Sequence, residues 1–162
     1  MKERELFNNL QGNWVITRNI TNKLDPLCSA DVKGKASVVQ ITKDKLGYKE
    51  SLDVLWKNGI SSKARGEYEY VMDNKGNLTL YNRVYEEVSY MFGIFFDQNN
   101  KQIAKGQYQC MQDYYKATYR ITDQNKFTLL FEVAGPDKNY SIFSSFMRDQ
   151  ESELLGVDTQ GN

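Results

Sequence analysis

The feature that most constrains the fold is a long succession of segments with two-residue periodicity. From Trp14 onward, apolar and polar residues alternate, and the segments are separated by clusters of Asp, Asn, Gln, Gly and Lys. Alternation with a period of two is typical of half-buried β-strands, and such clusters are typical of tight turns. No stretch keeps a helical period over more than about ten residues. The expected strands span residues 14–20, 33–42, 45–56, 63–73, 77–86, 88–97, 102–111, 113–122, 126–134 and 139–148.

Consecutive strands of similar length favour an all-β fold, a single antiparallel meander of eight to ten strands. An open meander of that length would expose two edge strands, so closure into a barrel is favoured. The two prolines, Pro26 and Pro136, lie outside the expected strands and interrupt no ladder. We expect a β-barrel domain over residues 1–148 that begins with a short helical turn at 2–10, followed by a polar C-terminal tail at 149–162.

Composition excludes several classes of function. The chain has no histidine, which rules out His-dependent catalysis and His-ligated metal sites. Lys+Arg and Asp+Glu number 21 each, and this balance argues against nucleic-acid or membrane partners. Cys28 and Cys110 cannot form a metal knuckle, and we interpret Cys110 as a small buried residue. With neither a signal peptide nor a bilayer-length apolar run, we expect a cytoplasmic protein without metal or cofactor.

Aromatic residues replace aliphatic ones in the expected core. Hydrophobic residues make up only 40% of the chain and the mean hydropathy is −0.65, yet aromatics reach 13%. The core must therefore be built from a few large rings. The 11 tyrosines can line a cavity or lie on the outside. Adjacent residues on a strand point to opposite faces, so one of Tyr114 and Tyr115 must face outward, where it is available to a protein partner.

The start of the first strand resembles that of lipocalin and calycin barrels. Gly12-Asn13-Trp14 follows the helical turn directly, and the last expected strand ends at Arg148. In that superfamily the first-strand tryptophan closes one end of the barrel and an arginine of the last strand packs across its ring. The resemblance therefore implies a closing contact between Trp14 and Arg148. A cation–π contact of this kind contributes about 0.5–2 kcal/mol.

Two further sets of spaced residues run through the chain. The first half carries Leu10-x-Gly12-x-Trp14-x-x-x-Arg18, Gly34-x-Ala36, Tyr48-x-Glu50 and Arg65-x-x-Tyr68-x-Tyr70. The second half carries Cys110-x-x-Asp113-x-Tyr115-x-x-x-Tyr119, Val133-x-Gly135-Pro136-x-Lys138-x-Tyr140 and Arg148. Together they are similar to an uncharacterised lipocalin-like family, domain of unknown function 6314, over about residues 6–149. The family pattern has a histidine where this chain has Tyr108, and the resemblance implies a fold more than a function.

Alternation brings several polar residues to the expected interior. Arg18 shares a face with Trp14, and Glu50, Asp113 and Tyr115 can be placed inward by similar counting. Buried charges are costly unless paired, so these groups should contact one another. Such a network can serve only to fix the strand register, or it can orient a ligand with an anionic or hydroxylated end. A catalytic pair of Asp113 with tyrosine is the third interpretation.

We expect a non-catalytic barrel that binds a small, mostly apolar molecule, because the chain has neither a metal motif nor a nucleophile motif. Such pockets usually exceed about 300 Å³, so an interior filled by rings would count against this function. The alternative is a structural or interaction subunit of a larger assembly, using outer-face tyrosines and the tail. The candidate ligand-binding residues are Arg18, Glu50, Arg65, Tyr68, Tyr108, Asp113, Tyr115 and Tyr119.

Overall fold

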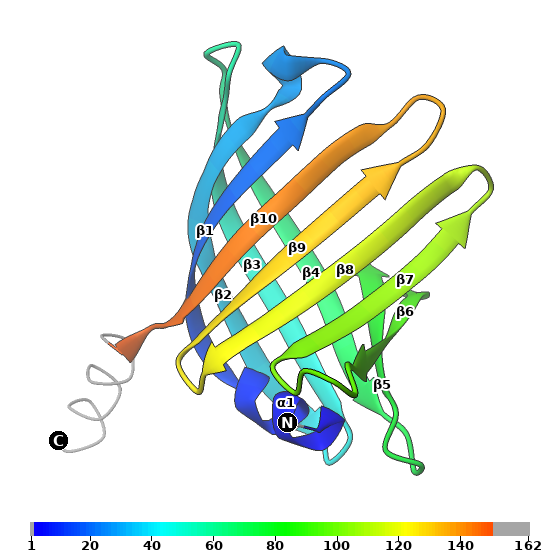
Figure 1. Ribbon diagram of the computed structural model, residues 1–162. Helices are drawn as coiled ribbons and strands as arrows, with labels where there is room; N and C mark the ends of the chain where they lie inside the picture. Colours follow the sequence, from blue (N-terminus) through cyan, green and yellow to red (C-terminus); the bar gives the residue numbers. More distant parts are fainter. Residues whose placement is uncertain (1, 151–162) are drawn as a thin grey trace, which may run out of the picture.

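The computed structural model describes residues 2–150 and shows a closed antiparallel barrel of ten strands (Figure 1). Each strand pairs with its neighbours in sequence, and the last strand returns to pair with the first. This confirms the expected fold class. The elements are α1 (Glu3–Leu10), β1 (Gly12–Asn22), the short 3-10 helix η1 (Pro26–Cys28), β2 (Ala30–Thr42), β3 (Lys45–Trp56), β4 (Ser61–Met72), β5 (Leu78–Val84), β6 (Glu87–Phe96), β7 (Ile103–Cys110), β8 (Asp113–Asp123), β9 (Lys126–Ala134) and β10 (Asn139–Arg148).

The strands follow the alternation closely, and the differences lie at their ends. β9 and β10 have the expected bounds, whereas β2 begins at Ala30, three residues before the expected start at residue 33. Ala30 and Val32 are buried, while Asp31 and Lys33 are not, so the period of two already starts at Ala30. The interior therefore receives one more pair of small apolar side chains than expected.

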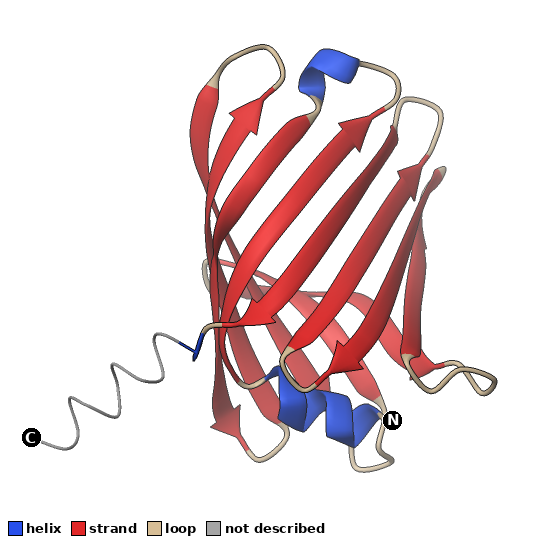
Figure 2. Cartoon of the chain, turned by 60° about the vertical axis from the view of Figure 1, so that its left-hand side comes forward, coloured by secondary structure: helices blue, strands red, loops and turns tan. Residues whose placement is uncertain are grey.

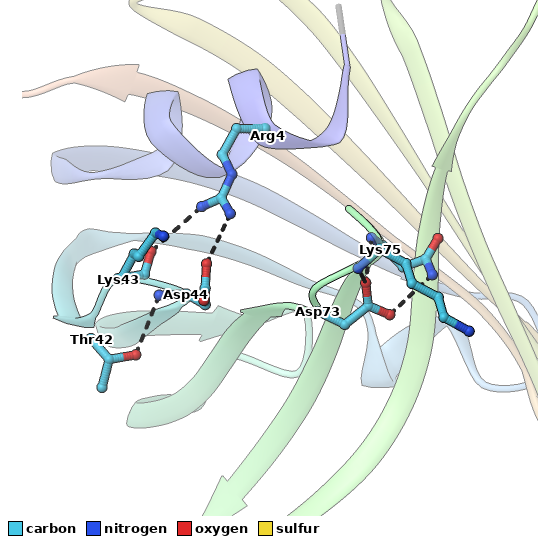
Figure 3. Close-up of polar contacts among 7 residues, drawn as sticks. Arg4, Thr42, Lys43, Asp44, Asp73 and Lys75 are labelled. Atoms are coloured by element: carbon cyan, nitrogen blue, oxygen red, sulfur yellow. Dashed lines mark hydrogen bonds and ion pairs between the residues drawn. The ribbon is translucent and has the colours of Figure 1, made fainter.

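The helix α1 covers one end of the barrel (Figure 2). Its apolar residues Leu6, Phe7 and Leu10 are buried. Arg4 ties the helix to the β2–β3 turn, where its guanidinium donates to Asp44 Oδ1 at 2.8 Å and to the Lys43 carbonyl at 3.5 Å (Figure 3). Burying three large side chains from one short helix removes this end of the core from water.

Trp14 and Arg148 meet at the same end, where β1 and β10 pair. The guanidinium carbon of Arg148 lies 4.1 Å from the centre of the Trp14 ring, and the Trp14 indole N–H donates to the Leu10 carbonyl at 2.8 Å. Arg148 also donates to the carbonyls of Gln11, Asn9 and Gln124, the last two at 2.9 and 2.7 Å. One buried ring and one arginine thus join the helix, the first strand and the last.

Aspartates organise the turns at this closed end. Asp73 Oδ1 accepts hydrogen bonds from the backbone N–H groups of Lys75 at 2.8 Å and Asn77 at 2.9 Å (Figure 3). Two further turns at this end repeat the pattern. Asp97 accepts a hydrogen bond from the backbone N–H of Asn99, and Asp123 accepts one from that of Asn125. This is the local bonding by which Asp favours turns over continued strand.

The loops at the opposite, open end are more apolar. Leu24, Leu27 and Ile60 are exposed there, and Tyr85 and Met111 at the tips of two hairpins are 92% and 90% exposed. Tyr85 and Met111 adopt φ of 55° and 57°, in the left-handed region that residues other than glycine rarely occupy. The two ends of the barrel therefore differ, with polar turns and a helix at one and exposed apolar loops at the other.

The wall between β6 and β7 is held differently from the rest of the barrel. Among residues 2–150 its ladder has two pairs, Phe95 with Lys105 and Phe96 with Ala104, and the strands separate toward the open end (Figure 1). There the Phe92 ring covers Gly106, where an added Cβ would lie 2.1 Å from Phe92 Cδ2. The Gly93 carbonyl oxygen would lie 2.9 Å from the same Cβ position, so the Phe92 ring and a β6 carbonyl both lie against Gly106. We call the stretch the β6–β7 seam.

Both cysteines are exposed. The interpretation of Cys110 as a buried residue was wrong, because it is the last residue of β7, beside the two-residue turn at the open end, beyond the packed interior. Cys28 lies in η1, and its thiol donates to Asp25 Oδ2 at 3.2 Å. This hydrogen bond is the main cause that raises the pKa of the Cys28 thiol.

Candidate functional site

A cavity of about 150 Å³ lies inside the barrel. Its polar side chains come from β1, β3, β4, β8 and β10, and its apolar side chains come from β5, β6, β9 and β10. We call the polar set the polar side of the lining and the apolar set its apolar side; β10 contributes to both, and β8 follows β9 around the barrel. The residues are Arg18, Tyr48, Glu50, Tyr68, Tyr70, Tyr119 and Ser144, and then Leu80, Met91, Phe92, Leu129, Phe131, Ile142 and Phe146.

A buried ion pair forms the centre of the polar side. Arg18 donates from two guanidinium nitrogens to the two oxygens of Glu50 at 2.8 and 3.1 Å. The exposed fractions of the two side chains are 14% and 6%. Ser144 Oγ accepts from Arg18 Nε at 2.7 Å, and the Tyr48 hydroxyl donates to Glu50 Oε1 at 2.7 Å. Burial lowers the pKa of Arg18, but the hydrogen bonds and charge of Glu50 outweigh it and the pKa is raised.

Tyrosine hydroxyls complete the polar side. The hydroxyls of Tyr70 and Tyr119 lie 3.1 Å apart in a hydrogen bond deep in the barrel. Burial is the largest cause that raises the pKa of both, and it raises the pKa of Tyr48 and Tyr68 as well. All four hydroxyls therefore stay protonated at neutral pH and keep a hydrogen to donate.

A second cluster lies nearer the open end. The rings of Tyr108 and Tyr115 are stacked, with their centres 4.4 Å apart and their planes at 5°. Lys138 Nζ lies 3.2 Å from Asp113 Oδ2 and donates to the Tyr115 hydroxyl at 3.3 Å. The hydrogen bond to Tyr115, followed by that to Asp113, raises the pKa of Lys138. Burial raises the pKa of Tyr108 to about 12.

The structure brings together four of the eight candidate residues. Arg18, Glu50, Tyr68 and Tyr119 line the cavity. The cluster near the open end contains Tyr108, Asp113 and Tyr115. Tyr108, Asp113 and Tyr115 do not line the cavity, but the rings of Tyr108 and Tyr115 lie beside those of Phe92 and Phe131, which do.

Arg65 lies in neither group. It is exposed on the outer face of β4, where it pairs with the exposed Ser51, while the next pair along, Glu50 with Gly66, faces inward. The expectation that Arg65 faces the interior was wrong. Alternation fixes which residues share a face, but it is the buried Tyr70 that decides which face of β4 is inside.

Three polar cavity residues were missed among the candidates, Tyr48, Tyr70 and Ser144. Tyr48 precedes Glu50 by two positions, and Tyr70 follows Tyr68 by two, so alternation could have found both. Ser144 could not be found in this way, because its place beside Arg18 depends on the register between β1 and β10.

Comparison with known proteins places the chain in a family. The model of a family of unknown function (DUF6314) matches residues 10–148. The chain belongs to this family. No curated protein is significantly similar to the chain in sequence.

Solved structures share the barrel of this DUF6314 protein. S-type phycobiliprotein lyase CPES from Guillardia theta has a TM-score of 0.65 at 12% identity, with 92% of this chain and 93% of that chain covered. Rv2717c from M. tuberculosis has a TM-score of 0.61 at 10% identity, with 92% and 98% covered. At these identities the likeness shows the fold alone. It confirms the resemblance to lipocalin-like barrels.

Two structural absences apply to residues 2–150 of the DUF6314 chain. No helix there has both the length and the apolar character required to cross a membrane. No three side chains of His, Cys, Asp or Glu in this range gather into a group that could hold a metal ion.

Proposed function

We propose that the barrel binds one small, mostly apolar molecule in its interior cavity and catalyses no reaction on it. The observation that carries the proposal is the mixed lining, in which the apolar residues Leu80, Phe92 and Leu129 line the same cavity as the Arg18–Glu50 pair. Small-molecule sites typically combine a mostly apolar wall with a few fixed polar groups. Here Ser144 and Tyr48 hold both partners of the ion pair in place.

The cavity volume limits the occupant. Sites for drug-sized ligands usually exceed about 300 Å³, and an apolar cavity of about 150 Å³ holds benzene. The volume here is also about 150 Å³. The interior cavity is thus smaller than the limit stated in the sequence analysis, which counts against the expected pocket. Our proposal is therefore restricted to a molecule of about one ring.

The protonation of the cavity groups supports a binding function without catalysis. A general base works best when its pKa lies near the working pH. Burial raises the pKa of the cavity tyrosines, including Tyr68 and Tyr70, away from neutrality. Arg18 is held as a cation by Glu50. These groups can orient a ligand, but at neutral pH they are poor proton acceptors.

Native mass spectrometry of protein purified from its own source tests the proposal. We expect a co-purified small molecule in the wild type and none in Leu80→Trp, which fills the cavity. Leu55→Trp is the matched control, because Leu55 is exposed and does not line the cavity. Absence of any small molecule from the wild type, together with no binding of one-ring probes, would contradict the proposal.

The second candidate function, an interaction subunit, is favoured by exposed tyrosines. Tyr85, Tyr90 and Tyr114 are all more than half exposed and lie on hairpins that reach the open end. The tail at 149–162, the other part of this hypothesis, lies largely outside the described residues. Cross-linking in native extract should connect one defined protein to the wild type and not to a Tyr85→Ser/Tyr90→Ser/Tyr114→Ser variant. Equal cross-linking of both would exclude this function.

A further inference from the structure

Several cavity hydroxyls have hydrogens without an acceptor. The clearest is that of Tyr68, which lines the cavity and has no hydrogen-bond partner among residues 2–150. Its ring is fixed by edge contact with Tyr48, with ring centres 5.6 Å apart. The hydroxyl is therefore held in place with its hydrogen free to donate.

The Tyr70–Tyr119 pair contributes another free hydrogen. Each hydroxyl carries one hydrogen, and a single hydrogen bond joins the two oxygens. Whichever tyrosine donates, the hydrogen of the other has no acceptor among the described residues. Both side chains are buried, so bulk water does not meet this hydrogen. The pair thus behaves as one donor toward the cavity.

The Ser144 hydroxyl also has a hydrogen without an acceptor, and Glu50 has too few free acceptor positions for all of these hydrogens. Ser144 Oγ accepts from Arg18, which leaves its own hydrogen without an acceptor among residues 2–150. Glu50 accepts from Arg18 twice and from Tyr48 once. A carboxylate has about four acceptor positions, so about one remains for three unmatched hydroxyl hydrogens. The cavity therefore offers a ligand hydroxyl hydrogens that Glu50 alone cannot accept.

Charge adds a second condition. Glu50 neutralises Arg18, so the polar side has no net positive charge to attract an anion. An anionic ligand would lie close to the Glu50 carboxylate, and a like charge in a buried site is unfavourable. A ligand without any acceptor atom would leave the hydroxyl hydrogens unmatched. The ligand that matches both conditions is uncharged and carries an acceptor.

We propose that the ligand is an uncharged one-ring molecule whose carbonyl-type oxygen accepts a hydrogen bond from the Tyr68 hydroxyl. Its ring packs against the apolar side, at Leu80 and Phe92. This inference rests on the proposed function and adds the chemical class of the ligand.

A series of matched one-ring probes tests the ligand class. Acetophenone carries a carbonyl oxygen, isopropylbenzene has nearly the same shape without one, and benzoate carries a charge. Titration followed by NMR gives the dissociation constants. For the wild type we expect acetophenone to bind about five- to tenfold more tightly than isopropylbenzene, the increment of one hydrogen bond. Benzoate should bind more weakly than acetophenone.

Two phenylalanine variants assign the donor. Tyr68→Phe removes the hydroxyl and keeps the ring, so acetophenone should lose its advantage while isopropylbenzene binds as before. Tyr114→Phe is the matched control, because Tyr114 is exposed and lies outside the cavity. It should preserve the advantage of acetophenone in full.

The outcomes separate the two proposals. Equal binding of acetophenone and isopropylbenzene to the wild type overturns the ligand class and leaves the binding function standing. An advantage of acetophenone that survives in Tyr68→Phe overturns the assignment of the donor. Binding of none of the probes, with no molecule co-purified from the source, overturns both the ligand class and the binding function.

Discussion

Glu50 is the side chain on which the buried charge of Arg18 depends. Its carboxylate accepts both guanidinium hydrogen bonds in the interior. Removing one partner of a buried ion pair leaves an uncompensated charge, so Glu50→Gln should lower the free energy of unfolding by about 3–5 kcal/mol. Urea denaturation measures the loss.

A variant on the opposite face provides the comparison. Glu67→Gln also removes one carboxylate from this sheet. The Glu67 carboxylate lies as far as 3.9 Å from the Arg83 guanidinium, and its side chain is 44% exposed. Exposed pairs contribute less than about 1 kcal/mol, and we expect a loss in that range. Similar losses for Glu50→Gln and Glu67→Gln would show that the Arg18–Glu50 pair is solvated.

Trp14 carries the packing of the closed end. It is buried against Phe127, with ring centres 4.9 Å apart, and beneath Arg148. Trp14→Ala should lower the free energy of unfolding by about 3–5 kcal/mol, as for other large core rings. Trp56→Ala, at the half-buried end of β3, should cost less. A shift in thermal midpoint no larger than that of Trp56→Ala would contradict this role.

At the scale of the strands, the buried tyrosines of β3, β4 and β8 make stability depend on alkaline pH. Burial raises the pKa of Tyr48, Tyr70 and Tyr119 in the folded chain, whereas unfolded tyrosine releases its proton near pH 10. The folded state then holds more protons than the unfolded state above pH 10. The contribution of these tyrosines to stability should be constant well below that pH and fall as the pH rises further.

Urea denaturation between pH 8 and pH 11 measures this decline. Tyr70→Phe removes one titrating group and should make the decline less steep, whereas the exposed Tyr114→Phe should leave it as in the wild type. An unchanged slope in Tyr70→Phe would mean that its pKa is the same in both states.

The β6–β7 seam predicts a local difference in hydrogen exchange. The ladder between β1 and β10 has nine residue pairs, whereas that between β6 and β7 has two. Backbone N–H groups of residues 88–94 and 106–110 that point across the seam have no ladder partner, so they should exchange faster than those between β1 and β10. Mass spectrometry or NMR of exchange measures this. Equal protection from exchange at the β6–β7 seam and between β1 and β10 would show that the β6–β7 ladder continues toward the open end.

The strands could be predicted well from the sequence, whereas the seam and the site could be predicted only in part. Alternation located β9 and β10 to the residue and placed Arg18, Glu50 and Tyr119 inside. The seam depends on a contact between Phe92 and Gly106, and such pairings across strands leave no local pattern. The cavity volume depends on how all the rings pack together, which is also a property of the assembled barrel.

For the molecule as a whole, the described contacts extend beyond Arg148. The Asp149 backbone N–H donates to the Asn13 carbonyl at 2.9 Å, and Asp149 is 5% exposed. The full chain should therefore unfold in one cooperative transition, while a chain that ends at residue 138 should show none because it lacks β10. Calorimetry compares the two. Cooperative unfolding of the shorter chain would show that nine strands suffice.

The pairing of β1 with β10 also has a consequence for synthesis of the chain. The partners Trp14 and Arg148 stand 134 positions apart, so the first strand leaves the ribosome long before its final neighbour exists. Until then β1 and the most recently made strand are both open edges, which can pair with other chains. Contacts of such long range also slow folding. Aggregation of newly made chains should therefore compete most strongly with folding in the interval before β10 emerges.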